Sequence, residues 1–292
     1  MPTISVILVT YNREKFLLTI LDSVKQQTFE DYELILVNNG STDSTAKICN
    51  DYAHCDSRVK LIHLEENIGA SFGRNSGLAT ATADYITFVD DDDRCEPDML
   101  SFLMNQAEET EADISICGSY NEFPDRLENY FICDDAFCFD RIDGLKQLLA
   151  RKLYNVAPPT KLFKRSLWEG LEFPENVLVD DIHVIYKVFE KASRIAVHNI
   201  PLYFFRKHES NMTSFIHNRT ITPELLDEYL EMYRIRAKYL AERAPEITID
   251  IEESVMAFMK SMCNSIYQNE LQGCENQLKL MTKYLHDKEC SK

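Results

Sequence analysis

Short apolar segments alternate with amphipathic segments over the first hundred residues, and this alternation most strongly constrains the fold. The apolar segments have the length of strands and are continuous, which is typical of parallel strands buried on both faces. They cover residues 4–10, 33–38, 59–64 and 85–89. Helical patterns follow them, over about 12–24, 45–54, 69–81 and 97–109, with Asn12 and Pro97 placed to begin the first and last. We therefore predict an α/β fold with a parallel sheet and right-handed crossovers.

The remaining two thirds of the chain give a less regular pattern. A further strand is predicted at 113–120, an irregular surface loop at 121–139 and a helix at 142–154. Residues 160–168 precede a segment, 173–192, that becomes helical near residue 180. Residues 194–213 favour short strands and then a polar loop. From residue 223 the pattern is helical, with one break near 243–250.

Composition excludes several classes of function. The formal net charge of −17 disfavours nucleic acid as a partner. The N-terminus lacks the basic leader of a signal peptide, and no apolar run is long enough for a transmembrane segment. The nine cysteines show no CxxC pairing, which favours reduced, scattered thiols. We expect a cytoplasmic protein, with association at the inner face of the membrane and homodimer formation left open.

Polar clusters follow three of the predicted parallel strands. They are "TYN" (10–12), "NNGSTD" (38–43) and "DDDD" (90–93). Ligands of open α/β sheets bind beyond the carboxyl ends of the strands, so the topology should bring these clusters together. No GxGxxG motif follows the first strand, which argues against a dinucleotide-binding domain.

The run of four aspartates is the most unusual of these clusters. At the end of a strand, alternate residues point the same way, so Asp90 and Asp92 are predicted to face a ligand while Asp91 and Asp93 point elsewhere. The alternative is that the run only caps the helix before Pro97, although a cap needs one carboxylate and not four.

Five segments in order resemble the inverting family 2 glycosyltransferases of the bacterial polysaccharide and glycan-assembly type. They are "SVILVTYNREKFLLTILDSVKQQTFEDYELILVNNGSTDST", "GRNSGLATATADYITFVDDDD", "TKLFKRSLWEGLEFPE", "VDDIHVIYKVFEKASRIA" and "PLYFFRKHESNMT". The resemblance implies a GT-A fold, which is the Rossmann-like fold of nucleotide-diphospho-sugar transferases, over residues 1–215. Residues 1–118 would be the nucleotide-sugar-binding half and 119–215 the acceptor-binding half. Residues 216–292 would be a helical C-terminal extension.

The resemblance implies that the aspartates bind a metal ion, Mn²⁺ or Mg²⁺, together with the donor. The family's Asp-x-Asp motif falls on Asp90, Asp91 and Asp92. Asp92 is expected to coordinate the metal, and Asp90 to act through the sugar, the ribose or a water. Asp93 would be a helix cap or would support the others. A cation at this place would neutralise the charge that a departing nucleoside diphosphate develops.

The first two clusters would hold the nucleotide. Thr10 and Tyr11 match family positions for a backbone contact to the base and for stacking on it, and Asn12 lies beside them. Asn39 occupies a position where many relatives have the aspartate that accepts a hydrogen bond from uracil. Both aspartates of the family pair are replaced here, by Asn38 and Asn39. An amide oxygen can still accept that bond, so uridine remains the expected base.

Several basic residues are expected near the donor. Arg74, in "GRNSG", matches an arginine that reaches the base or the phosphates, with a surface arginine as the alternative. Lys161 could face the donor, and Arg206 and His208 belong to a cationic patch in a segment that often closes over the diphosphate. His208 is also a candidate metal ligand. The alternative for the patch is a solvated loop.

The catalytic base implied by the resemblance is Asp181, in "VDDIH". An inverting transfer needs a group that takes the proton of the acceptor hydroxyl, and a carboxylate suits this task. Asp180 lies beside it, and both residues could instead stabilise a helix N-terminus.

These expectations combine into one function with one alternative. The chain would be a metal-dependent inverting glycosyltransferase, a hexosyltransferase that moves a hexose or N-acetylhexosamine to a hydroxyl group. The donor would be UDP-glucose, UDP-galactose or a UDP-N-acetylhexosamine, and the acceptor a glycan, a lipid-linked glycan or a glycoprotein. The alternative is a catalytically inactive GT-A domain that acts as a binding or scaffold subunit, which the replacement of both family aspartates by Asn38 and Asn39 suggests.

Overall fold

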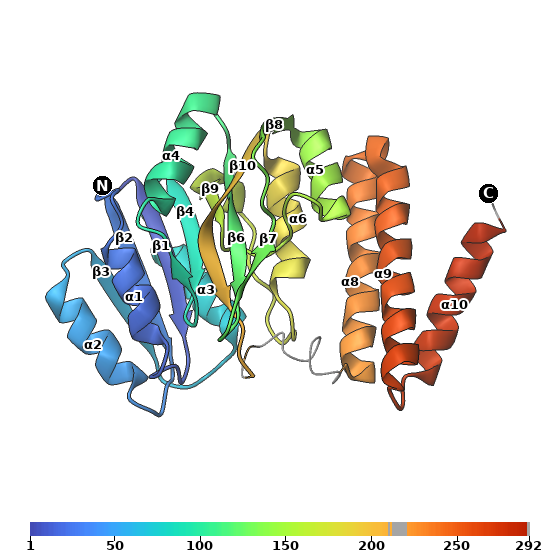
Figure 1. The fold of residues 1–292 in the computed structure, drawn as a ribbon, viewed down its shortest axis with the longest axis horizontal. Helices are drawn as coiled ribbons and strands as arrows, with labels where there is room; N and C mark the ends of the chain where they lie inside the picture. Colours follow the sequence, from blue (N-terminus) through green and yellow to red (C-terminus); the bar gives the residue numbers. More distant parts are fainter. Residues whose placement is uncertain (210, 212–220, 291–292) are drawn as a thin grey trace. The chain divides into compact units, whose positions relative to one another are not determined.

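The computed structural model describes residues 1–209, 211 and 221–290. These residues form two compact units, Met1–Lys207 and His208–Lys292. The first unit is a mixed α/β unit and the second is helical (Figure 1). The predicted boundary between residues 215 and 216 lies outside the described residues, as does most of the segment "SNMT" (210–213).

The first hundred residues of the first unit follow the predicted alternation, and further strands and helices come after them. Its strands are β1 Ile4–Thr10, β2 Tyr32–Asn39, β3 Val59–Leu64, β4 Tyr85–Asp90, β5 Arg94–Cys95, β6 Ile114–Glu122, β7 Leu127–Tyr130, β8 Ala136–Asp140, β9 Lys161–Lys164 and β10 Arg194–Arg206. Its helices are α1 Leu17–Lys25, α2 Thr45–Cys55, α3 Ala70–Thr80, α4 Met99–Thr110, α5 Arg141–Ala150, the 3-10 helix η1 Arg165–Trp168 and α6 Asp181–Lys191.

Within the described residues these strands form one ten-stranded sheet in the order β3-β2-β1-β4-β9-β6-β10-β5, with β7 paired to β6 and β8 to β10. The strands β1, β2, β3 and β4 pair in parallel, as predicted. β9 pairs antiparallel with both β4 and β6 and thereby joins the parallel half to the rest of the sheet. The α/β fold class and its helical C-terminal region are confirmed.

Helices cover both faces of the parallel half. On one face, alternate β1 residues such as Ile4, Val6 and Leu8 share a core with apolar side chains of α1, α2 and α4. On the other face α3 lies very close to β1. A Cβ built on Gly73 or Gly77 would come within 2.5 Å of the side chains of Val9 or Ile7. The small residues of α3 are therefore needed for this close approach.

Three details of the secondary structure differ from the predictions. Residues 121–139 are not a structureless loop, because they contain β7 and β8. Residues 194–206 form one strand, β10, whose register shifts around Pro201. The fourth helix begins at Met99 and not at Pro97.

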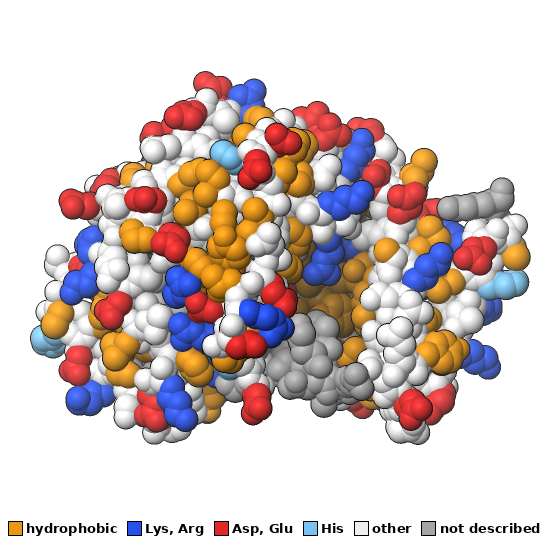
Figure 2. All heavy atoms as spheres, in the orientation of Figure 1, with side chains coloured by type: hydrophobic (Ala, Val, Ile, Leu, Met, Phe, Trp, Pro, Cys, Tyr) orange, Lys and Arg blue, Asp and Glu red, His pale blue; other side chains and the backbone are white. Residues whose placement is uncertain are grey.

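The second unit contains α8 Pro223–Arg243, the 3-10 helix η2 Pro245–Ile247, α9 Thr248–Asn269 and α10 Glu275–Glu289. Thr222 caps α8, since its side chain accepts a hydrogen bond from the Leu225 N–H. The ring of Phe258 in α9 stacks on Tyr233 of α8 at 4.2 Å between centroids. Among the described helices, none has both the length and the apolar character required to cross a membrane. Acidic, basic and apolar side chains are interspersed over the face shown in Figure 2.

Candidate active site

The carboxyl ends of β1, β2 and β4 meet at one edge of the sheet. Thr10 lies opposite Asn38 in the parallel register, and Val9 lies opposite Asp90. The three polar segments that follow these strands therefore begin side by side, as the alternating pattern predicted. Since ligands of such sheets bind beyond this edge, the backbone register alone places a candidate site here.

Asn12 joins the first two polar segments. Its N–H donates to Ser41 Oγ at 3.1 Å, and its Oδ1 accepts from the Thr42 N–H at 2.8 Å. The φ of Asn12 is 52°, a left-handed conformation in which asparagine is enriched. The prediction that Asn12 caps the first helix was wrong, because α1 begins only at Leu17 and the side chain turns toward the second segment.

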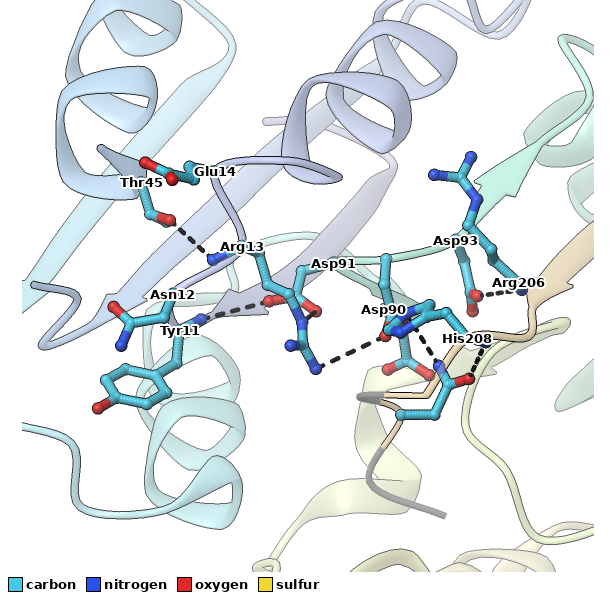
Figure 3. Close-up of polar contacts among 12 residues, drawn as sticks. Tyr11, Asn12, Arg13, Glu14, Thr45, Asp90, Asp91, Asp93, Arg206 and His208 are labelled. Atoms are coloured by element: carbon cyan, nitrogen blue, oxygen red, sulfur yellow. Dashed lines mark hydrogen bonds and ion pairs between the residues drawn. The ribbon is translucent and has the colours of Figure 1, made fainter. Parts of the chain in front are cut away.

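Thr10 is buried at the end of β1, whereas the next side chain is accessible. Tyr11 is 38% exposed, and Figure 3 shows its ring directed away from the aspartates. Its N–H donates to Asp91 Oδ2 at 3.2 Å. An accessible aromatic face at this edge offers a surface on which a planar base can stack.

The aspartate run leaves the strand after its first member. β4 ends at Asp90, and the Asp93 N–H donates to the Asp90 carbonyl at 3.4 Å, so that the intervening residues form a turn. The strand geometry predicted for Asp90 and Asp92 was therefore wrong, because Asp92 lies in the turn. Asp93 caps no helix either, because β5 follows it directly.

Arg13 lies against the middle of the run. Its Nε is 3.3 Å from Asp91 Oδ1 (Figure 3), and its Nη2 is 3.7 Å from Asp92 Oδ2. The Arg13 N–H donates to Thr45 Oγ1 at 2.8 Å, which fixes the backbone of Arg13 at the start of α2. One guanidinium thus serves two neighbouring carboxylates, which its planar array of donors allows.

Arg74 of α3 joins the run to the start of α6. Its Nη1 lies 2.5 and 2.6 Å from the two carboxylate oxygens of Asp180, and its Nη2 lies 3.4 Å from Asp90 Oδ1. Ser71 Oγ donates a further bond to Asp180 at 3.3 Å. Arg74 was predicted to reach the base or the phosphates, and the structure places its guanidinium between two carboxylates. That pairing links the aspartate run "DDDD" to the segment "VDDIH".

Asp93 is buried beside the end of β10. The Arg206 N–H donates to its Oδ1 at 2.8 Å, and the Tyr203 hydroxyl forms a second bond to the carboxyl group. The same hydroxyl accepts a bond from the Asp90 N–H at 3.0 Å. Tyr203 is fully buried. It therefore connects the last strand of the unit to both ends of the aspartate run.

The pKa values of the aspartates reflect this crowding of charge. Burial, followed by the charge of Asp92, raises the pKa of Asp91 to about 7, although the neighbouring Arg13 acts in the opposite direction. Burial and Asp92 also raise the pKa of Asp90, and burial raises the pKa of Asp93 well above its ordinary value. An additional cation would stabilise the ionised forms of these groups.

The donor set fits a divalent cation that is shared with a ligand. In the part of the chain that the structure describes, no three His, Cys, Asp or Glu side chains are grouped closely enough to hold a metal ion by themselves. Mg²⁺ is commonly bound through one or two carboxylates together with phosphate oxygens and water, and Mn²⁺ takes similar oxygen ligands. Asp90 and Asp92 can supply two carboxylates of this kind.

Asn38 and Asn39 both make hydrogen bonds within the protein. The Asn38 amide nitrogen lies 3.0 Å from His63 Nδ1. The Asn39 amide donates to Asn67 Oδ1 and to the Gly69 carbonyl, both at 3.0 Å. The Asn39 bonds hold the segment before α3 against the end of β2, and the Asn38 contact joins β2 to β3. Asn39 is buried, so its predicted contact with the base stays a prediction that requires rearrangement or sharing of these bonds.

Asp181 begins α6 and has the properties of a candidate base. Its Oδ1 is buried and has no hydrogen-bond partner among the described residues. Burial, and then the adjacent charge of Asp180, raises its pKa to about 7, while Arg74 acts in the opposite direction. A carboxylate that titrates near neutral pH, with one oxygen unused by the protein, is suited to accept a proton. Asp180 occupies the N-cap position, but its side chain pairs with Arg74.

Lys161, Arg206 and His208, the other basic residues predicted near the donor, each make different contacts. Lys161 is buried, its ammonium donates to the Ala157 carbonyl at 2.7 Å, and burial lowers its pKa to about 7. Arg206 Nε lies 3.5 Å from Glu122 Oε2. His208 is the first residue of the second unit, and its backbone N–H donates to Asn211 Oδ1 at 2.7 Å. Their predicted contacts with the donor stay predictions.

Sequence reasoning missed Arg13 and Tyr203. Arg13 carried one usable signal, since it is the first basic residue after β1 and a run of four acids needs nearby cations. Tyr203 carried none, because its contact with Asp90 and Asp93 depends on the antiparallel pairing of β10 with β5.

Comparisons with known proteins identify the family of the chain. The sequence matches the family model "Glycosyl transferase family 2" over residues 5–171. The glycosyltransferase GlyG of Streptococcus pneumoniae serotype 4 is 30% identical over 219 residues, which are 72% of each protein. The putative glycosyltransferase EpsH of Bacillus subtilis is 30% identical over 250 residues, which are 82% of this chain and 70% of EpsH.

Solved structures share the fold at low sequence identity. Residues 1–349 of S. aureus TarS in complex with UDP-GlcNAc give a TM-score of 0.68 at 22% identity, over 91% of this chain and 73% of that one. The mannosyltransferase PcManGT of Pyrobaculum calidifontis, in complex with GDP-Man and Mn²⁺, gives 0.60 at 17% identity, over 96% and 84%. With the polar sheet edge and the sequence match, these likenesses lead to one assignment: the chain is a glycosyltransferase of the GT-A fold and belongs to glycosyl transferase family 2.

Proposed function

We propose that the protein is a metal-dependent inverting transferase that moves a hexose or N-acetylhexosamine from a UDP-sugar to a hydroxyl group of a glycan, lipid-linked or glycoprotein acceptor. UDP-glucose, UDP-galactose and UDP-N-acetylhexosamines are the proposed donors. A structure of similar fold holds UDP-GlcNAc, and another holds a nucleotide sugar with Mn²⁺, which supports a nucleotide-sugar donor and a cation.

The observation that carries this proposal is the connection between Asp181 and the aspartate run. Asp180 and Asp181 are adjacent at the start of α6, and Arg74 binds Asp180 and Asp90 with the same guanidinium. A carboxylate with an unused oxygen is thus held at a fixed place relative to the residues proposed to bind the donor. Positioning of this kind is what a displacement reaction requires.

Asp181 would act as the general base. Its carboxylate takes the proton of the acceptor hydroxyl while the hydroxyl oxygen forms a bond to the anomeric carbon. The bond from that carbon to the diphosphate oxygen breaks, and its electron pair leaves with UDP. A bound divalent cation would neutralise the charge that develops on the diphosphate. Attack opposite to the leaving group inverts the anomeric configuration.

The decisive variant is Asp181→Asn, which keeps the size of the side chain and removes its basicity. We expect transfer to fall by about 10²- to 10⁴-fold, the usual contribution of a general base. UDP binding, measured by calorimetry with Mn²⁺, should stay within about twofold of wild type. Asp140→Asn is the matched control, since Asp140 also lies at a helix N-terminus, where it caps α5.

Two outcomes would contradict the proposal in different ways. Full transfer activity in Asp181→Asn would remove Asp181 as the base. UDP binding by the wild type without turnover of any UDP-sugar would instead favour the scaffold alternative. The engagement of the Asn39 amide within the protein is the observation that keeps this alternative worth testing.

A further inference from the structure

We propose that Arg13 is a built-in counter-cation of the aspartate run, and that it makes the donor and its metal ion bind together instead of the metal ion alone. The inference rests on the proposed function, because it concerns a donor site that is assisted by a cation. It assigns to Arg13 a role in selecting what binds, separate from the chemical step.

The first support is geometric. The Arg13 guanidinium lies 3.3 Å from Asp91 and 3.7 Å from Asp92 and is only 19% exposed. Its backbone is held by the bond to Thr45 Oγ1, so the side chain starts from a fixed point. The positive charge therefore lies beside Asp92, the carboxylate that the family resemblance selects for the metal ion.

The second support is a comparison with Arg74, the other arginine at the run. Arg74 Nη1 is bonded to both oxygens of Asp180, at 2.5 and 2.6 Å. The contacts of Arg13 with Asp91 and Asp92, at 3.3 and 3.7 Å, are longer than these bonds, as is the 3.4 Å contact of Arg74 with Asp90. The pairing of Arg13 with the run is therefore easier for an incoming ligand to exchange than the pairing of Arg74 with Asp180.

The third support is the balance of charge. A free divalent cation that approaches Asp92 is repelled by a guanidinium held on the same carboxylates. A cation bound to a nucleoside diphosphate arrives with its charge largely neutralised, and the phosphate oxygens are suitable acceptors for an arginine. Arg13 thus disfavours the free ion and tolerates, or binds, the complex of ion and nucleotide.

The test measures binding of Mn²⁺ alone, from the electron paramagnetic resonance signal of the free ion, in wild type and in Arg13→Gln. We expect the variant to bind free Mn²⁺ at least about tenfold more tightly, since one unit charge close to a divalent ion has an effect of this order even at the dielectric constant of water. Arg13→Lys should resemble wild type, because it keeps the charge. Arg58→Gln is the matched control, since Arg58 pairs with Asp56 away from the run and its loss changes the net charge equally.

A second titration adds UDP. In wild type, UDP should increase the affinity for Mn²⁺ strongly, and by linkage Mn²⁺ should increase the affinity for UDP by the same factor. In Arg13→Gln this coupling factor should be about tenfold smaller, because the free ion is no longer repelled. Equal coupling factors in the two proteins would overturn the inference.

A melting experiment in EDTA tests the counter-cation role without any metal ion. Arg13→Gln should lower the Tm by at least about 2 °C, since two carboxylates lose a cationic partner. Adding Asp92→Asn to that variant should recover part of the loss, because one uncompensated charge is removed. Strictly additive changes in Tm would overturn the role of Arg13.

Failure of the inference can be distinguished from failure of the proposed function. If wild type transfers sugar normally and the free Mn²⁺ affinities of wild type and Arg13→Gln are equal, only the role of Arg13 is overturned. If wild type takes up no Mn²⁺ even with UDP and shows no transfer, the proposed function and the inference are both overturned.

Discussion

The carboxylates of the aspartate run have partners that come from distant parts of the chain. Arg74 reaches Asp90 from α3, Arg13 reaches the middle of the run from the segment after β1, and Tyr203 reaches Asp93 from β10. A buried charge is tolerated only when it is paired. The run is therefore stable only in the assembled unit, where its residual negative charge suits a cationic ligand.

The pH dependence of transfer should follow the ionisation of Asp181. Because Asp181 must be deprotonated to act as a base and its pKa is about 7, we expect kcat/KM to rise with pH through about 7 and to level off above it. Asp180→Asn removes an adjacent negative charge, which lowers the pKa of Asp181. The midpoint of the profile should then move to lower pH, as measured by initial rates over pH 5 to about 9.

The control for this shift is Asp140→Asn, which removes a carboxylate at another helix N-terminus. Its midpoint should match that of wild type. A midpoint that stays unchanged in Asp180→Asn would show that the titrating group is not Asp181.

For single residues, the sequence predicted which side chains lie at the candidate site better than it predicted which residues they contact. Thr10, Asn38 and Asp90 could be placed at one sheet edge because parallel register follows from the alternation of strands and helices. The sequence could indicate that the run needs a nearby cation, but which carboxylates Arg13 contacts depends on the turn that follows β4. The strand alternation assumed for Asp92 was wrong for the same reason, because Asp92 lies in this turn.

Among the elements, β10 contributes contacts to the aspartate run that its sequence did not indicate. It runs from Arg194 to Arg206, pairs with β6, β8 and β5, and ends beside the aspartate run. The sequence favoured short strands here, and the one strand that forms has its register interrupted at Pro201. β7 and β8 were missed because they are short and largely exposed, and their pairing depends on partners distant in sequence.

Removing the Tyr203 hydroxyl, through which β10 contacts the aspartate run, should destabilise the first unit. In Tyr203→Phe the Asp90 N–H and the Asp93 carboxyl both lose a buried partner, so we expect the free energy of unfolding to fall by about 2 to 4 kcal/mol. Urea unfolding followed by tryptophan fluorescence measures this, because Trp168, the single tryptophan of the chain, is buried in the first unit.

The matched control is Tyr154→Phe, which removes another buried hydroxyl. The Tyr154 hydroxyl donates to the Gly144 carbonyl at 2.8 Å, and we expect its loss to cost about 1 kcal/mol. The Tyr203→Phe variant should also weaken UDP binding in the presence of Mn²⁺, whereas Tyr154→Phe should not. Equal effects of the two substitutions would show that the Tyr203 hydroxyl has no special connection to the run.

In the whole molecule, the two ends of the parallel strands carry polar side chains with different roles. Polar side chains that are proposed to bind ligand gather at the carboxyl edge of the parallel strands, and Glu33 supports the strands near the opposite edge. Its Oε1 accepts bonds from Ser5 Oγ at 2.6 Å and from the N–H and hydroxyl of Thr82 at 2.8 and 2.9 Å, and Lys60 pairs with the same carboxylate. The sequence predicted the strands but gave no sign of this buried acid, whose donors come from three different segments.

Glu33 should make the first unit sensitive to acid. Burial alone would raise its pKa, but the bonds from Lys60, Ser5 and Thr82 lower it from 4.5 to about 2. A carboxyl whose folded pKa is lowered stabilises the protein above its unfolded pKa, and that stability is lost as pH falls through the folded pKa. The contribution is about 3 kcal/mol at neutral pH and disappears between pH 4.5 and about 2.

Glu33→Gln should therefore lower the free energy of unfolding by about 3 kcal/mol at pH 7. The difference from wild type should shrink as the pH falls below about 4.5, because the wild-type carboxylate becomes protonated while the amide does not titrate. Urea unfolding followed by Trp168 fluorescence at several pH values measures it. Glu65→Gln, at an exposed position after β3, should change stability by less than about 0.5 kcal/mol throughout. A Glu33→Gln difference that is as large at pH 2.5 as at pH 7 would mean that the substitution acts through packing, and not through the charge that joins these strands.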